Sequence, residues 1–227
     1  MWPARRTVKS QVAQRRSRMA DKSQRKGYHH GNLRQTLVEA ALDLVVEKGP
    51  QGFTMAEAAR RAEVSPAAPY RHFKNQEDIL TEAARQGYLI FADQLREASE
   101  AAGPDPLKAF EATGRSYLAF AQEHPGYYIA MFESSISIAN NPELSLASEK
   151  AMAVLTDAAK DLTVHLPPEK RPPPSMIAHH IWAMSHGVVE LFLRGEPGSR
   201  APFSPNDLLE SGTGIYLRGL GLIPQDA

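Results

Sequence analysis

The residues from Thr54 to Phe73 constrain the fold more than any other stretch, because they describe two short helices joined by a tight turn. Thr54 is a suitable N-cap residue, and Glu57 three residues later completes a capping box. Ser65 has the side chain to cap a second helix, with Pro66 at its first position, where a missing N–H costs nothing. The pattern therefore predicts two closely packed helices, the second beginning at Pro66.

The second of these helices is expected to turn small and polar side chains outward: Ala67, Ala68, Tyr70, Arg71 and His72, with Lys74 at its end. A helix of this kind has the chemistry to enter the major groove of DNA. The plainer alternative is a helical hairpin within an ordinary α-helical domain. It is disfavoured because an exposed Tyr70, His72 and Lys74 would serve no packing purpose.

The segment AEVSPAAPYRHFKNQEDIL resembles the helix-turn-helix signature of the TetR family of transcriptional regulators. Upstream of it, GYHHGNLRQTLVEAALDLVVEKG looks like the first helix of the same domain. The resemblance covers about Gly27 to Tyr88. It implies that Tyr70, His72 and Lys74 mainly contact phosphates, as does Thr54 at the start of the preceding helix.

The same segment indicates which side chains would read bases. Arg71 is the best candidate for a guanine, whereas Ala67 and Ala68 can touch a thymine methyl but donate no hydrogen bond. The complete set expected to contact DNA is Arg34, Thr54, Ser65, Ala67, Ala68, Tyr70, Arg71, His72 and Lys74.

Residues 1–34 are strongly basic, with ten Lys or Arg and one acidic residue, although the whole chain has a formal net charge of zero. A basic arm on an otherwise acidic protein points to a polyanionic partner. Residues 1–26 lack hydrophobic periodicity, so we expect disorder in the absence of DNA. A solubilising tail, a native start at Met19 and an organelle transit peptide remain open; the last ranks lowest because the resembled family is bacterial.

The rest of the chain predicts an all-α fold. Residues 27–75 form the expected three-helix DNA-binding domain, 75–101 a linking helix, and 102–227 a regulatory and dimerisation domain. The first helix should end at Gly49 in the left-handed conformation, and Asn75 should cap the linking helix. Later helices are expected over about 106–124, 127–137, 143–165, 175–193 and 206–222. No segment shows the alternation of a β-strand.

Composition limits the compartment and the chemistry. The chain has no cysteine, so neither disulfides nor thiol chemistry can contribute. It has no apolar run long enough to span a membrane, and its N-terminus lacks the apolar core of a signal peptide. A cytoplasmic protein without a membrane partner is therefore expected.

The second half contains the aromatic residues of a candidate ligand cavity. Trp182, His186 and Gly187 resemble the Trp-His-Gly pattern of one TetR subgroup, which implies a small ligand held in the domain core. Aromatic side chains with polar tips suit such a cavity, although filling a helical core is the commoner use of each residue. The predicted ligand contacts are Phe110, Tyr117, Phe120, Tyr127, Phe132, Trp182 and His186.

The last two helices offer a dimer interface and one weak metal-site candidate. Their apolar residues predict a two-fold four-helix contact: Ile181, Val188, Leu191, Phe192, Leu208, Leu209, Ile215 and Leu220. His179, His186 and Glu190 share a helical face and could chelate zinc, but a satisfied polar network is the favoured explanation. We therefore predict neither a metal nor a cofactor.

The sequence lacks the common enzyme signatures. There is no Gly-x-Ser-x-Gly elbow, no phosphate loop and no His-Glu-x-x-His. A small all-α enzyme and a helical interaction protein without DNA binding remain the alternatives. The favoured function is a bacterial, ligand-responsive repressor that binds a pseudo-palindromic operator as a homodimer and is released by a small-molecule effector.

Overall fold

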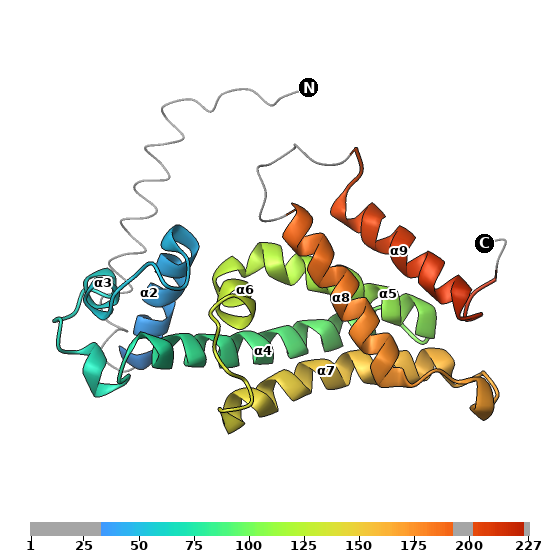
Figure 1. The fold of residues 1–227 in the computed structure, drawn as a ribbon, viewed down its shortest axis with the longest axis horizontal. Helices are drawn as coiled ribbons and strands as arrows, with labels where there is room; N and C mark the ends of the chain where they lie inside the picture. Colours follow the sequence, from blue (N-terminus) through green and yellow to red (C-terminus); the bar gives the residue numbers. More distant parts are fainter. Residues whose placement is uncertain (1–32, 193–201, 225–227) are drawn as a thin grey trace.

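The computed structural model describes residues 33–192 and 202–224, and every regular element within these ranges is helical. The α-helices are α2 (Leu33–Lys48), α3 (Met55–Arg61), α4 (Gln76–Ala101), α5 (Pro106–Glu123), α6 (Pro125–Phe132), α7 (Pro142–Thr163), α8 (Pro174–Phe192) and α9 (Pro205–Gly219). Two short 3₁₀ helices, η1 (Pro69–Arg71) and η2 (Pro168–Lys170), complete the list. In Figure 1, α2 and α3 lie at one end of the molecule, α9 lies at the other, and α4 runs between them. The all-α prediction is confirmed.

The helices at the N-terminal end begin and end as their sequences predict. The Thr54 side chain accepts the Glu57 N–H while the Glu57 carboxylate accepts the Thr54 N–H, so the capping box is present. Gly49 follows α2 with φ +80°, the left-handed conformation that favours glycine. The same conformation at Glu63, with φ +58°, ends the α3 segment. The expected cap of α2, Asn32, lies outside the described residues.

The predicted helix from Pro66 is wrong in length. Only Pro69–Arg71 is helical, as a 3₁₀ turn whose N-cap is Ala68 rather than Ser65, and Ala68 makes no side-chain cap hydrogen bond. The cause is chemical: Pro69 has no N–H to bond the Ser65 carbonyl, which instead accepts the Ala68 N–H at 2.9 Å. The next amides continue this short-range pattern, with His72 N–H reaching the Pro69 carbonyl at 2.9 Å.

The linking helix α4 matches its prediction. The Asn75 side chain accepts the Asp78 N–H at 2.9 Å, and the helix continues to Ala101. Ten of its residues are buried, including Phe91 and Leu95, because α2, α5, α6 and α7 all pack against it. It therefore connects the N-terminal helices to the rest of the core.

Helix α6 lies close to both α2 and α4 because glycines permit it. A Cβ atom built on Gly126 would lie 3.0 Å from the Leu42 carbonyl oxygen of α2, and one on Gly87 of α4 would lie 2.7 Å from the Met131 sulfur. The helix is shorter than predicted, ending at Phe132 rather than Ser137. Ser135 has φ +58°, which is incompatible with continued helix.

The C-terminal helices α8 and α9 bury several residues that were predicted to face a partner subunit. Ile181, Val188 and Leu209, predicted at a dimer interface, lie in the core of their own protomer. They are covered because α8 packs on α5 and α7, and α9 packs on α5 and α8. Leu191 and Ile215 are exposed, at 52% and 67%. None of the helices in the described ranges is long and apolar enough to cross a membrane.

Candidate DNA-binding surface and effector core

The turn after α3 presents an exposed polar surface held by two buried anchors. Pro69 and Phe73 are buried, whereas Tyr70 is 60% exposed and His72 and Lys74 are exposed. Arg71, Ser65 and Ala67 are also exposed, and Ala68 is half-buried. The structure thus brings these predicted residues together on one turn while the anchors fix its position.

Thr54 lies at the start of α3, where its hydroxyl is already engaged. Its Oγ1 accepts the Glu57 N–H and also lies 3.2 Å from a Glu57 carboxylate oxygen. Lys48 binds the other oxygen of Glu57 at 2.6 Å. Hydrogen bonds from Lys48 and from the Thr54 backbone outweigh desolvation and lower the pKa of the Glu57 carboxyl. Glu57 therefore stays ionised and keeps the cap formed.

Arg34 differs from the other predicted DNA contacts. Its guanidinium binds the Glu82 carboxylate through two nitrogens, at 2.8 and 3.1 Å. The same group lies 5.1 Å from the centre of the Phe73 ring, in cation–π geometry. This side chain is engaged by Glu82 and Phe73, although 47% of its surface stays exposed.

A cluster of aromatic rings fills the space between α4, α5, α6 and α8. Phe91 contacts three of its rings, with ring-centre distances of 5.0 Å to Tyr117, 4.9 Å to Phe120 and 6.0 Å to Trp182. Phe132 packs on Trp182 at 5.8 Å. We call the cluster the aromatic core; it consists of Tyr88, Phe91, Tyr117, Phe120, Tyr128, Phe132, Trp182 and His186.

His186 is satisfied within the aromatic core. Its Nδ1 lies 2.7 Å from the Tyr128 hydroxyl and 3.3 Å from the Tyr117 hydroxyl. Burial, reinforced by the neighbouring Tyr128, raises the pKa of Tyr117 well above its ordinary value. Burial also raises the pKa of Tyr88 to about 12. These phenols therefore stay protonated at neutral pH and act as neutral polar tips.

Two predicted ligand contacts lie outside the aromatic core. Phe110 belongs to a second apolar cluster with Ile181 and lines a gap of about 20 Å³ between α5, α8 and α9. Tyr127 points away from the aromatic core, and its hydroxyl donates to the Gln86 side chain of α4 at 3.2 Å. The sequence pattern grouped them by residue type, whereas their helical positions separate them.

Three members of the aromatic core were missing from the predicted site: Tyr88, Phe91 and Tyr128. Tyr88 and Phe91 lie on the buried face of α4. Tyr128 follows Tyr127, and one position along a helix turns it from the α2 side to the α8 side. The sequence did carry a signal for this: adjacent residues of a helix point to different sides, so Tyr127 and Tyr128 could not both face one cavity.

The residues suggested as a metal site do not converge. The Nδ1 atom of exposed His179 lies 2.6 Å from the Ser175 carbonyl, whereas His186 faces two tyrosines. Among the described residues, no three histidine or acidic side chains are placed to hold a metal ion. Arg194, considered as a partner for Glu190, lies outside the described ranges.

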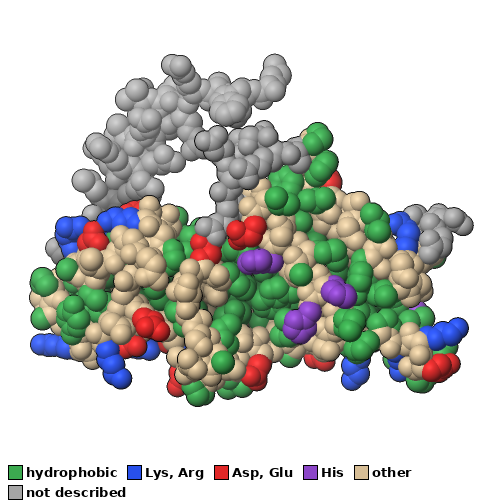
Figure 2. Space-filling model, viewed as in Figure 1, with side chains coloured by type: hydrophobic (Ala, Val, Ile, Leu, Met, Phe, Trp, Pro, Cys, Tyr) green, Lys and Arg blue, Asp and Glu red, His purple; other side chains and the backbone are tan. Residues whose placement is uncertain are grey.

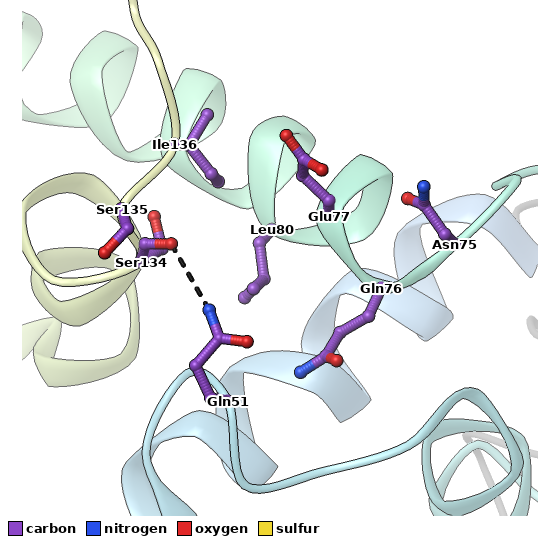
Figure 3. Close-up of a pocket in the computed structure, with 8 residues that line it drawn as sticks. All are labelled: Gln51, Asn75, Gln76, Glu77, Leu80, Ser134, Ser135 and Ile136. Carbon is purple, nitrogen blue, oxygen red and sulfur yellow. Dashed lines mark hydrogen bonds between the residues drawn. The ribbon is translucent and has the colours of Figure 1, made fainter.

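A polar cleft separates the DNA-binding elements from the loop after α6. It has a volume of about 390 Å³ and is lined mainly by amide and hydroxyl side chains (Figure 3): Gln51, Asn75, Gln76, Glu77, Leu80, Ser134, Ser135 and Ile136. The Gln51 amide crosses it to the Ser134 carbonyl at 3.5 Å, the long limit of a hydrogen bond. Gln76 instead binds the Pro50 carbonyl at 2.7 Å.

The surface view places apolar and charged side chains in different regions. Figure 2 shows hydrophobic and histidine side chains across the middle of one face, whereas Lys and Arg lie mostly toward its two ends. The exposed polar turn at one end and the aromatic core beyond it are thus separate regions.

Family comparisons agree with this division. Residues 37–83 match the family described as "Bacterial regulatory proteins, tetR family", and residues 110–214 match "Tetracyclin repressor-like, C-terminal domain". The chain belongs to the TetR family of bacterial transcriptional regulators. TetR-family proteins are transcription factors, so the alternative of an all-α enzyme is not favoured. The Trp-His-Gly subgroup stays a prediction.

Individual relatives match as much as 85% of the chain. The uncharacterized HTH-type transcriptional regulator YobS of Bacillus subtilis (strain 168) is 24% identical over 126 residues, which span 56% of this chain and 63% of that protein, less than two thirds of its length. A Rhodococcus sp. RHA1 protein of unknown function is 26% identical, with a TM-score of 0.71, covering 85% of this chain and 97% of that one.

A second similar structure is AibR in complex with isovaleryl coenzyme A and operator DNA. It is 18% identical, with a TM-score of 0.63, and the match covers 80% of this chain and 96% of AibR. At this identity the comparison establishes the shared fold alone.

Proposed function

We propose that this protein is a ligand-responsive repressor that binds a pseudo-palindromic DNA operator as a homodimer and acts in the bacterial cytoplasm. The observation that carries the proposal is the exposed turn after α3. Tyr70, His72 and Lys74 lie there in the open, while Pro69 and Phe73 beneath them are buried. Within the described ranges these three side chains form no hydrogen bond or ion pair, which suits contact with phosphates.

The basic arm supports the same partner. The nine Lys or Arg residues within 1–26 would neutralise phosphates without reading a detailed base code. The arm lies almost wholly outside the described residues, so this argument rests on the sequence. It adds affinity in the proposal, whereas Arg71 supplies base recognition.

A homodimer is supported by the apolar side chains that α8 and α9 leave exposed. Leu191 is 52% exposed and Ile215 is 67% exposed, although both helices bury their other faces in the protomer. A two-fold contact through these faces would place two recognition turns on adjacent major grooves, ~34–36 Å apart. Sedimentation at micromolar concentration should show a dimer, and a monomer there would count against this part.

The aromatic core is the proposed effector site. It joins large apolar faces to the hydroxyls of Tyr117 and Tyr128, which suits an apolar or aromatic small molecule with one or two polar groups. Because the rings already contact one another, the effector must displace some of them. Phe132 and Trp182 are half-buried and are the proposed movable walls.

The DNA-binding proposal is tested by Lys74→Ala. If Lys74 contacts a phosphate, binding should weaken alike for all sequences, and the slope of log K against log salt should flatten by about one unit. A change in sequence preference would show that Lys74 reads bases. Failure of the wild-type protein to bind any duplex would exclude the function itself.

The effector proposal is tested by Trp182→Ala. Once a compound that releases DNA has been found by screening, the variant should keep its DNA affinity and lose the response. His186→Ala should act in the same direction more mildly, because Tyr117 and Tyr128 would remain. A normal response in both variants would place the effector elsewhere.

A further inference from the structure

Glu82 of α4 is a buried carboxylate, 6% exposed, that gathers partners from α2 and from its own helix. Arg34 binds it through two nitrogens at 2.8 and 3.1 Å. Arg85 binds it through Nε at 3.0 Å and through a terminal nitrogen at 2.8 Å. Two guanidinium forks on one carboxylate give a fixed geometry that a single point contact could not.

The neutral members of this network extend it to a third helix. The Gln86 amide donates to Glu82 at 2.8 Å and to Gln35 of α2 at 2.9 Å. Its oxygen accepts the hydroxyl of Tyr127 in α6 at 3.2 Å. The Glu82 network, by which we mean Arg34, Gln35, Glu82, Arg85, Gln86 and Tyr127, therefore joins α2, α4 and α6.

The network also reaches the DNA-binding turn. The Arg34 guanidinium lies over the Phe73 ring at 5.1 Å, and Phe73 is one of the two buried anchors of that turn. On another side of the same junction, the cleft of about 390 Å³ is crossed by the 3.5 Å contact from Gln51 to Ser134 (Figure 3). The Glu82 network is therefore a polar attachment at this junction, beside the apolar packing of α2 on α4 and α6.

We propose that Glu82 and Arg34 are positioning residues for DNA binding, which fix α2 and the Phe73-anchored turn relative to α4 and α6. Arg34 then serves DNA binding through Glu82 and Phe73 rather than through a phosphate. Tyr127 belongs to the same network instead of lining the effector site. The inference rests on the proposed DNA-binding function and deepens it.

The discriminating variant is Arg34→Lys, tested with the full chain on a 30-bp duplex selected by the wild-type protein from a random pool. Lysine keeps the charge that a phosphate needs but cannot form the two-nitrogen fork on Glu82 or lie flat over Phe73. We expect about a tenfold loss of affinity, the size of one charge-assisted hydrogen bond, with an unchanged salt slope. Arg34→Gln should weaken binding with the same unchanged slope.

Three further variants complete the experiment, and the first of them is Glu82→Gln alone. Glu82→Gln combined with Arg34→Gln should bind no more weakly than the worse single variant, since both remove one interaction. Arg96→Gln is the matched control, because it removes the same charge from an exposed pair with Asp93 elsewhere on α4. It should bind as the wild type does.

The outcomes separate the two roles of Arg34. Wild-type affinity in Arg34→Lys, with a slope lower by about 0.9 in Arg34→Gln, would make Arg34 a phosphate contact and overturn the proposal. Wild-type affinity in both would show that the network positions nothing. If Glu82→Gln does not fold, the Arg34 variants still decide the question. Absence of binding by the wild type would instead refute the proposed function.

Discussion

The DNA-binding turn and the aromatic core differ in how far their aromatic and polar side chains are exposed to solvent. Tyr70, 60% exposed, lies open above the buried anchors of its turn, whereas Phe91 is fully buried among three other rings. In the core, even the polar His186 is bonded to two tyrosine hydroxyls. The first region can meet a partner as it stands, and the second must rearrange to admit one.

The largest expected effect is a loss of stability when a ring is removed from the aromatic core, which tests the comparison directly. Phe91→Ala should lower the free energy of unfolding by ~3–5 kcal/mol, because a large buried ring leaves a cavity. Tyr70→Ala, matched as an aromatic truncation, should change stability by less than ~0.5 kcal/mol while weakening DNA binding. Urea unfolding followed by circular dichroism measures both. Equal losses of stability would show that the turn is core rather than binding surface.

A second prediction concerns acid stability at the junction between the regions. Burial would raise the pKa of Glu82, but hydrogen bonds from Arg85, Arg34 and Gln86 outweigh it and lower the pKa from 4.5 to about 2. Since the folded pKa is depressed, the stabilisation is complete above about pH 5 and is lost as the pH falls toward 2. The stabilisation that the ionised Glu82 carboxylate contributes is on the order of 3 kcal/mol.

The measurement is the free energy of unfolding between pH 7 and pH 3. Glu82→Gln should be less stable than the wild type at pH 7 and should lose less stability on acidification. Glu97→Gln, which removes an exposed carboxylate of the same helix, should follow the wild-type curve. Parallel curves for the wild type and Glu82→Gln would contradict the assigned pKa.

A smaller effect is expected from the glycine that seats α6 on α2. Gly126→Ala would bring a Cβ atom 3.0 Å from the Leu42 carbonyl oxygen, so it should lower stability by ~1–3 kcal/mol. Gly187→Ala is the control, because its Cβ would meet no atom within 4 Å and alanine favours helix. Thermal unfolding of the two variants should shift in opposite directions. Equal shifts would mean that α6 has room beside α2.

Local signals predicted much of the fold. The bounds of α4 followed from the Asn75 cap and the break at Gly103-Pro104, and the capping box at Thr54 is present as predicted. These features depend on residues within one turn of each other. The second helix of the helix-turn-helix was overestimated because Pro69 lacks the amide that would make its first helical hydrogen bond, to the Ser65 carbonyl.

The site was predicted less completely, since it depends on which helices meet. The exposed turn could be described from its own residues. The aromatic core also needed Tyr88 and Phe91 from α4, and its separation from Tyr127 depends on how α6 lies between α2 and α8. Glu82 was not singled out, because the partner that ties it to α2, Arg34, is 48 residues away in the chain. Such long-range pairing has no local pattern.

The most direct test of the account is to sequence the genomic fragments that the purified full-length protein retains, alongside Lys74→Ala. The account predicts a shared pseudo-palindromic site with half-sites ~34–36 Å apart, and Lys74→Ala should retain the same site in lower yield. Retained fragments without a common two-fold site, or a different site for Lys74→Ala, would contradict it.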